Sequence, residues 1–205
     1  MISSEFLLAA LIVVLMPGTG VVYTLGVAIA RGGAASVAAA LGCTLGIVPA
    51  VLAAAVGLSA VLHAGAIGYT VLKYAGAAYL LHLAWKTLRG GGPLRVRPED
   101  GARSFARIAR TGALINVLNP KLSVFFLAFL PQFIDPAAAY APQMAAMSAI
   151  FMGLTFAVFV LYGLLAAGLA ARTLRSERAM AWISRASAAA FAAMGLRLAL
   201  SEDPA

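Results

Sequence analysis

Two short interruptions in an otherwise apolar sequence are the places where this chain could do chemistry. The first is Pro17-Gly18-Thr19-Gly20. Proline removes a backbone donor and clashes with the preceding turn, and glycine relaxes the backbone. We therefore expect a helix to open here, and its freed N–H groups to attract an anion such as a carboxylate. These four residues are predicted to bind substrate, and a simple packing kink is the alternative, since Pro and Gly are frequent in membrane helices.

The second interruption carries polar side chains: Asn116, Asn119, Pro120, Lys121 and Ser123. A lysine in the middle of a membrane helix costs a few kcal/mol, so we expect Lys121 to face a polar interior. Asn116, Asn119 and Ser123 are spaced i, i+3 and i+7, which places them on one face of a helix. Such a face either joins helices or lines a pathway. We predict a substrate site in which Lys121 pairs with a carboxylate and the asparagines bind other polar groups.

Two further basic side chains, His82 and Lys73, are candidates for a proton relay. Histidine exchanges protons near neutral pH. Lys73 lies near one end of an apolar run. The alternative for this residue is that its long side chain extends to the membrane surface and has no role in proton transfer.

All seven acidic residues lie at the ends of apolar runs or between them. No buried carboxylate is therefore available for a divalent cation, and neither histidine has a Cys, Asp or Glu at metal-ligand spacing. We predict no metal, no cofactor and a substrate without net charge.

The composition identifies the solvent that surrounds these residues. The chain has 205 residues, of which 63% are hydrophobic and 11% charged, against roughly 25% charged in a soluble domain. Its mean hydropathy is +0.96. A soluble protein of this size cannot hide so much apolar surface, which excludes disordered chains, disulfide scaffolds and almost every soluble enzyme fold. The net charge of +8 fits basic cytoplasmic loops, so we predict no nucleic-acid partner.

Six apolar runs are long enough to cross a membrane as helices: 6–30, 37–62, 67–88, 111–133, 143–171 and 180–200. We therefore predict an all-α, polytopic membrane protein with six transmembrane helices. The polar stretch 89–110 contains a Gly-Gly-Gly-Pro sequence and six arginines, which favours a loop. One transmembrane domain, 1–205, would then consist of a first repeat (5–88), a cytoplasmic loop (89–110) and a second repeat (111–200).

The two halves resemble each other. Residues 11–17 and 114–120 match at a constant offset of 103, with five of seven positions identical, including the proline. Because each half has an odd number of predicted spans, the second inserts upside down relative to the first. Inverted repeats of this kind are typical of secondary transporters, whose substrate sites lie near the midplane where interrupted helices meet.

Small residues on the second run predict close helix packing. Gly42 and Gly46 form a GxxxG pair, which lets two backbones approach each other. The single cysteine, Cys43, lies between them and is predicted to be a small packing residue.

The distribution of basic residues predicts the topology. Twelve of the fifteen Lys and Arg residues lie on the side of the first, third and fifth connections. The positive-inside rule makes that side cytoplasmic and places both termini outside the cytoplasm. The arginines of 89–110 could bind lipid headgroups or a regulator, although a topology signal explains them more simply.

Longer motifs add a family resemblance. They are Arg31-Gly32-Gly33-Ala34, Lys73-Tyr74-Ala75-Gly76-Ala77-Ala78-Tyr79-Leu80, Trp85-Lys86, Asn116-Val117-Leu118-Asn119-Pro120-Lys121 and the stretch 125–133. With these motifs the chain resembles the LysE-type amino-acid exporter family, in particular its homoserine/threonine exporter (RhtB) branch. The resemblance implies a six-span inner-membrane exporter driven by the proton gradient. One departure is that the family typically continues Pro-Gly with Pro and then Asn or Asp, where this chain has Thr19 and Gly20.

We therefore predict a secondary transporter, not an enzyme, that exports neutral amino acids resembling homoserine, threonine or leucine, or close derivatives, by proton antiport across the plasma membrane. Its partners would be the amino-acid substrate, protons and membrane lipid, with a homo-oligomer left open. The alternatives are an exporter of another small solute, such as a homoserine lactone, and a non-transporting membrane accessory protein. An intramembrane enzyme would need a buried nucleophile–base pair or a metal pair, and no HExxH or GxSxG motif is present.

Overall fold

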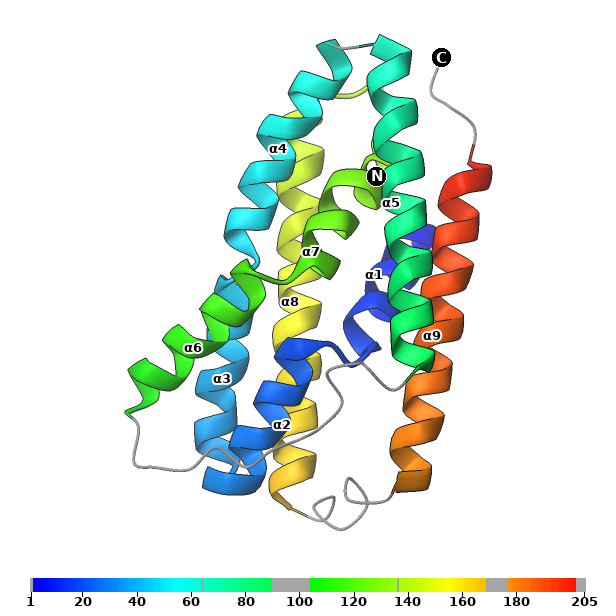
Figure 1. Ribbon diagram of the computed structural model, residues 1–205. Coiled ribbons are helices and arrows are strands. Elements are labelled where there is room, and N and C mark those ends of the chain that lie inside the picture. The colour runs from blue at the N-terminus through cyan, green and yellow to red at the C-terminus, as the bar shows by residue number, and fades with distance from the viewer. Residues whose placement is uncertain (1, 64, 90–103, 136, 169–176, 202–205) are drawn as a thin grey trace.

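The computed structural model describes residues 2–63, 65–89, 104–135, 137–168 and 177–201, and every regular element in these ranges is a helix (Figure 1). The α-helices are α1 (Ser4–Leu15), α2 (Thr19–Arg31), α3 (Gly33–Leu45), α4 (Val48–His63), α5 (Gly65–Leu88), α6 (Phe105–Val117), α7 (Pro120–Val124), α8 (Tyr140–Ala167) and α9 (Glu177–Leu200). After α7 the chain continues as the π-helical segment η1 (Phe125–Phe129) and the 3₁₀ segment η2 (Leu130–Phe133). The all-α prediction is confirmed for the described residues.

Within the described residues, two to four helices are long and apolar enough to cross a membrane. Two segments in the described ranges qualify directly, Gly33–Gly57 and Tyr140–Ala167. Two bent pairs qualify only when each is taken as one span: α1 with α2, bent by 51°, and α6 with Lys121–Phe133, bent by 54°. The third and sixth predicted spans correspond to α5 and α9. These helices are long enough, but basic side chains such as Lys73 and Arg185 dilute their apolar character.

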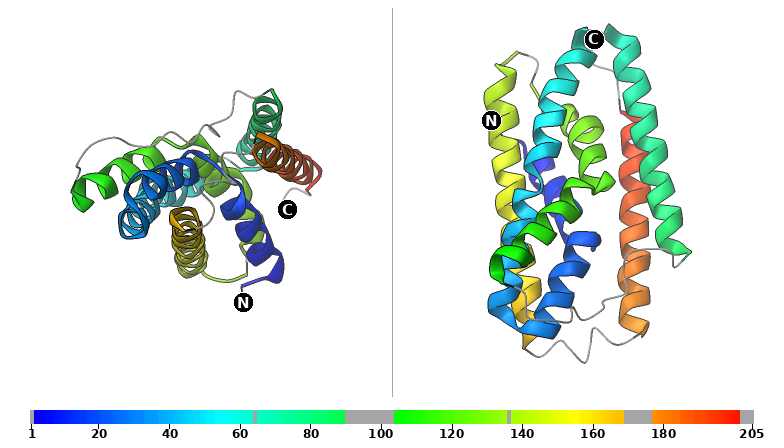
Figure 2. Two further views of the ribbon diagram at one scale, coloured as in Figure 1. Left: turned by 90° about the horizontal axis from the view of Figure 1, so that it is seen from below. Right: turned by 60° about the vertical axis from the view of Figure 1, so that its left-hand side comes forward.

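Elements of the first half pack mainly on elements of the second half. Helix α2 packs against α8, α3 against α6, and α5 along α9. The two views in Figure 2 show α5 and α9 standing together beside the remaining helices. This interleaving brings residues more than 70 positions apart in sequence into contact.

The contact between α3 and α6 is a seam of backbone against backbone. A Cβ atom added at Gly42 would overlap the carbonyl of Ala109, and one added at Gly46 would overlap the carbonyl of Ala113. From the other side, a Cβ at Gly112 would lie 2.8 Å from the carbonyl oxygen of Ala39. The predicted close-packing face of the GxxxG pair is thereby confirmed. The seam fixes the C-terminal end of α6, and with it Asn116, against α3.

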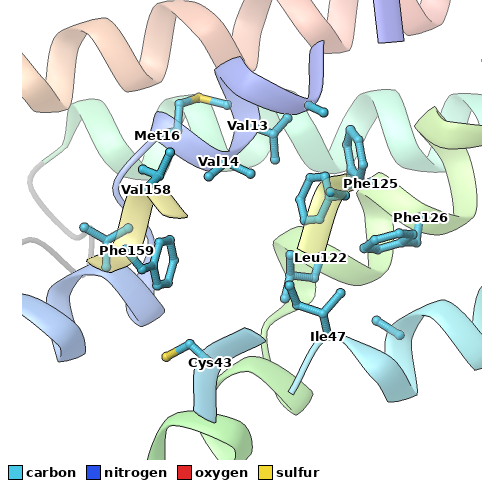
Figure 3. Packing of buried hydrophobic residues seen from close by; sticks show 14 of the residues in the cluster. Val13, Val14, Met16, Cys43, Ile47, Leu122, Phe125, Phe126, Val158 and Phe159 are labelled. Atoms are coloured by element: carbon cyan, nitrogen blue, oxygen red, sulfur yellow. The ribbon is translucent and has the colours of Figure 1, made fainter. Parts of the chain in front are cut away.

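The buried core surrounds the region where the two bent pairs meet. Val13 and Val14 of α1, Phe159 of α8 and Leu122 of α7 point toward this region from different helices (Figure 3). Beside it, the rings of Phe125 and Phe151 stack with centroids 4.7 Å apart. The polar residues described next are therefore held in a tightly packed apolar shell.

Candidate functional site

The first helix break leaves backbone groups without their usual partners. Helix α1 ends at Leu15, Met16 is extended, and α2 begins at Thr19. Pro17 has no N–H, so it cannot donate to the carbonyl of Val13 four residues earlier. The N-cap of α2 is Gly18, which offers no side-chain hydrogen bond. The break thus presents carbonyls at the end of α1 and N–H groups at the start of α2, as the sequence predicts.

The second break satisfies its own backbone. Helix α6 ends at Val117, and α7 begins at Pro120. Asn119 is the N-cap of α7, and its Oδ1 accepts the N–H of Lys121 at 3.1 Å. Proline at the first helical position costs nothing, because an N–H there has no partner in the helix. This break is a conventional helix start that leaves the amide groups of two asparagines inside the protein.

Lys121 joins the two breaks. Its Nζ donates to the carbonyl oxygens of Val13 and Met16, at 3.1 Å each. These are unpaired carbonyls at the C-terminal end of α1, the negative end of the helix dipole. A Cβ atom at Gly18 would lie only 3.3 Å from the same Nζ. A cation from the second half therefore caps a helix of the first half.

The two asparagines form a short hydrogen-bonded chain. Asn119 Nδ2 donates to Asn116 Oδ1 at 3.3 Å, and Asn116 Nδ2 donates to the carbonyl of Cys43 at 2.7 Å. Both side chains are buried. A Cβ atom at Gly20 would approach Asn116 Oδ1 to 2.8 Å and the ring of Phe159 to 3.0 Å. Glycine at position 20 is thus required by this close approach, which explains the absence of the larger side chain that the resemblance leads one to expect.

A small cavity lies between these groups. It is lined by Val13, Val14, Gly18, Gly20, Asn116, Asn119, Lys121, Leu122, Phe151, Thr155 and Phe159. Its volume is about 10 Å³, which is room for roughly one water molecule. Five of the nine predicted substrate-binding residues line it. In this conformation the cavity is closed to anything as large as an amino acid.

The other four predicted binding residues do not line this cavity. Thr19 is exposed at the start of α2, and Ser123 does not line the cavity. The spacing argument for Ser123 assumed a continuous helix, and the break between Val117 and Pro120 rotates it away from Asn116. Pro17 lines a second, apolar cavity of about 490 Å³, which shares no lining residue with the first. There the hydroxyl of Tyr162 donates to the carbonyl of Leu15 at 3.0 Å. Pro120 begins α7, next to Lys121.

The two candidates for a proton relay are not brought to the cavity. Lys73 is buried and donates from Nζ to the carbonyl oxygen of Ser201, at the end of α9. His82 is exposed, with its ring centroid 6.2 Å from that of Tyr79. Within the described ranges no three His, Cys, Asp or Glu side chains come together as a metal site would require.

Sequence reasoning missed the contribution of α8. Phe151, Thr155 and Phe159 line the cavity from this helix, and the hydroxyl of Thr155 donates to the carbonyl of Phe151 at 2.8 Å. A threonine in the middle of the long apolar run 143–171 was the signal that could have identified this face. The carbonyl of Val13 could not have been found in this way, because no side chain marks it.

Comparisons with known proteins identify the family of this chain. A family model described as LysE type translocator matches residues 11–202. The chain belongs to this family. The resemblance predicted from the sequence motifs is therefore confirmed, and this LysE type translocator is a membrane transport protein.

Curated relatives match over nearly the whole chain. An uncharacterized membrane protein of Vibrio cholerae serotype O1 is 31% identical over 197 residues, which is 96% of each chain. One from Pseudomonas aeruginosa is 32% identical over 201 residues, covering 95% of this chain and 93% of the relative. The homoserine/homoserine lactone efflux protein of Salmonella typhimurium is 28% identical over 194 residues, covering 95% and 94%. No solved structure matches this LysE type translocator.

Proposed function

We propose that this LysE type translocator is a secondary exporter that moves small neutral amino acids, or close derivatives of them, out of the cell through the cavity between the two helix breaks. The observation that carries the proposal is the bridge made by Lys121, which joins the start of α7 to the end of α1. The Lys121 side chain closes the cavity between the two broken helices. In the proposed mechanism, the cavity opens to one side of the membrane or the other when the two halves of the chain move apart. Broken helices meeting at a central site are typical of transporters that work by alternating access.

The packing supports an inverted repeat of two three-helix units, 5–88 and 111–200, joined by a cytoplasmic loop at 89–110. Each first span packs on the second span of the other half, α2 on α8 and α6 on α3, while the third spans α5 and α9 pair with each other. A two-fold axis between the halves produces this pattern. In this proposal all six predicted helices cross the membrane within one transporter domain.

The orientation proposed for the inner membrane has both termini outside the cytoplasm. Two observations support it. The Oε2 atom of Glu5, at the start of α1, lies 3.3 Å from Nη2 of Arg197, near the end of α9. The start of the first helix and the end of the last helix therefore lie at the same end of the protein. The α2–α3 turn with Arg31, the start of α6 and the end of α8 gather at the opposite end (Figure 1), and the predicted positive charge belongs to that end.

The lining of the cavity favours a solute with opposite charges and no net charge. Carbonyls at the end of α1 suit an ammonium group, while N–H groups at the start of α2 and Lys121 suit a carboxylate. The asparagines can bind a hydroxyl group or a ring oxygen. No Asp or Glu is among the lining residues in the described ranges, so a second positive charge on the solute has no counterion there. Because one relative is named a homoserine/homoserine lactone efflux protein, a lactone is the competing substrate.

An efflux experiment tests the proposal. Cells lacking their own exporters would express wild type, Gly20→Val or Gly153→Val at matched membrane levels, preloaded with threonine, homoserine, leucine, lysine or homoserine lactone. Valine at position 20 collides with Asn116 and Phe159, whereas a Cβ atom at Gly153 meets nothing within 4 Å. We expect wild type and Gly153→Val to release a neutral amino acid, and Gly20→Val to release it about tenfold more slowly or worse.

Other outcomes would change the conclusion. Release of lysine alone would overturn the argument from charge. Release of the lactone alone would replace amino acids with lactones as substrates. If wild type released none of the five solutes, the proposal would fail and a non-transporting accessory role would become the better explanation.

A further inference from the structure

We infer that Lys121 couples transport to protons because its ammonium group occupies the place where the ammonium group of the substrate must bind. The inference rests on the proposed function and deepens it. It assigns the exchanged proton to one atom, Lys121 Nζ, and it requires the substrate to carry a free ammonium group.

The hydrogen bonds of Lys121 are those that a substrate ammonium would make. The break at Pro17 leaves two inward-facing carbonyls at the end of α1, those of Val13 and Met16, and Nζ donates to both at 3.1 Å. The end of a half-helix with unwound carbonyls is a cation site in transporters. Here the cation is already present, and it is tethered to α7. The cavity of about 10 Å³ has no room for an amino acid beside it.

Among the described residues, no carboxylate side chain lines the cavity that could hold two cations at once. Other titratable or charged side chains on the described parts of the elements packed around Lys121 are Glu5 on α1, Tyr23 and Arg31 on α2, Cys43 on α3, Lys73, Tyr74, Tyr79, His82 and Lys86 on α5, Arg107 and Arg110 on α6, Tyr140 and Tyr162 on α8. None of them lines the cavity. Two ammonium groups sharing two carbonyls, with no carboxylate side chain beside them, repel each other strongly in a medium of low dielectric constant. The substrate ammonium can therefore take the two carbonyls only after Lys121 leaves them, and we infer that Lys121 leaves as the neutral amine.

Each step of the proposed exchange of a proton for substrate conserves atoms and charge. On the cytoplasmic side one N–H bond of the Lys121 ammonium breaks, the electron pair stays on Nζ, and the proton passes to water. The substrate ammonium then takes the carbonyls of Val13 and Met16, and its carboxylate faces the first turn of α2 and the neutral amine of Lys121. On the outer side the substrate leaves, and Nζ takes a proton from water and returns to the carbonyls. One proton enters for each neutral zwitterion that leaves.

This arrangement explains how a translocator without an acidic side chain at its central cavity can still exchange protons for solute. It also narrows the substrate class. Solutes with a free α-ammonium group, including amino acids and their lactones, compete with the Lys121 proton. An N-acetylated amino acid has no cation to place on the α1 carbonyls, so it is not exchanged for a proton.

The test is proton release on binding by the full chain in lipid nanodiscs at low buffer strength, with homoserine as the probe and a pH-indicator dye as the readout. We expect wild type to release close to one proton per homoserine bound, and N-acetylhomoserine to cause no release. Lys121→Gln keeps two N–H donors for the carbonyls but cannot titrate, so it should bind and exchange homoserine without releasing a proton. The exposed Lys86→Gln is the matched control and should behave as wild type.

Lys121→Arg provides a second, independent check. Arginine keeps its charge in proteins, so the carbonyls stay occupied, and we expect homoserine exchange to fall about tenfold or more. Binding of homoserine by wild type without proton release would overturn the inference and leave the proposed function standing. Solute export driven by a pH gradient in Lys121→Gln would do the same. Absence of homoserine binding and of any solute efflux by wild type would overturn both.

Discussion

The two helix breaks have matching sequences but different roles in the structure. The first, around Pro17 and Gly18, leaves its backbone groups uncapped within its own half. The second, around Asn119 and Pro120, caps its own helix and directs polar side chains inward. Lys121, from the second break, supplies the cap that the first lacks. In the proposed repeat, one break therefore contributes backbone groups to the cavity and the other contributes side chains.

This division of roles suits a site for an asymmetric solute. Two identical breaks would present the same groups twice, whereas an amino acid has different groups at its two ends. The glycine at position 20 makes the divergence sterically necessary, because Asn116 of the second break occupies the space where a side chain at this position would lie. The polar side chain expected in the first break is in effect replaced by one from the second.

Replacing Asn116 with Leu should have the largest effect, because it removes the side-chain part of the second break. The change leaves two buried groups without their hydrogen-bond partners: the backbone carbonyl of Cys43 and the side-chain Nδ2 of Asn119. We expect a loss of about 1–3 kcal/mol of folding free energy and a fall in homoserine efflux of about a hundredfold. Thermal unfolding in detergent and efflux at matched membrane levels measure the two effects.

Ser123→Ala is the control for Asn116→Leu, since the spacing in the sequence places both residues on one face. The structure separates Ser123 from the cavity, so we expect efflux within about twofold of wild type, as for a change outside the site. Equal losses in the two variants would mean that α6 and α7 act as one continuous face.

Pro17→Ala should have the next largest effect, because it repairs the first break. Alanine restores an N–H that can donate to the carbonyl of Val13 four residues earlier, in competition with Lys121. We expect one added backbone hydrogen bond to raise the folding free energy by about 1 kcal/mol and efflux to fall about tenfold. A variant that is more stable and less active would show that the break at Pro17 lowers stability and is needed for transport. Unchanged efflux would show that the opened carbonyls of α1 are not part of the site.

The sequence was informative wherever a local rule applied. Proline beside glycine predicts the first break, Asn119 before Pro120 marks a helix start, and the spacing of Gly42 and Gly46 predicts the seam with α6. Contacts between the two halves of the chain could not be predicted from the sequence. Lys121 reaches carbonyls more than 100 residues earlier, and backbone acceptors carry no side-chain signature. The expected common face of Asn116 and Ser123 does not form for a related reason, since the periodicity of a helix holds only while the helix is continuous.

Pro120→Ala should have the smallest effect, although Pro120 is the counterpart of Pro17 in the proposed repeat. Position 120 is the first residue of α7, where an added N–H gains no helical partner, and Asn119 still caps the helix through the N–H of Lys121. We expect a change of less than about 1 kcal/mol in folding free energy and efflux within about twofold of wild type. Measured beside Pro17→Ala, this variant tests whether the two prolines differ in role. If both substitutions reduced efflux equally, the second break would act as an opened helix like the first, and the assignment of bare backbone to one half and side chains to the other would be wrong.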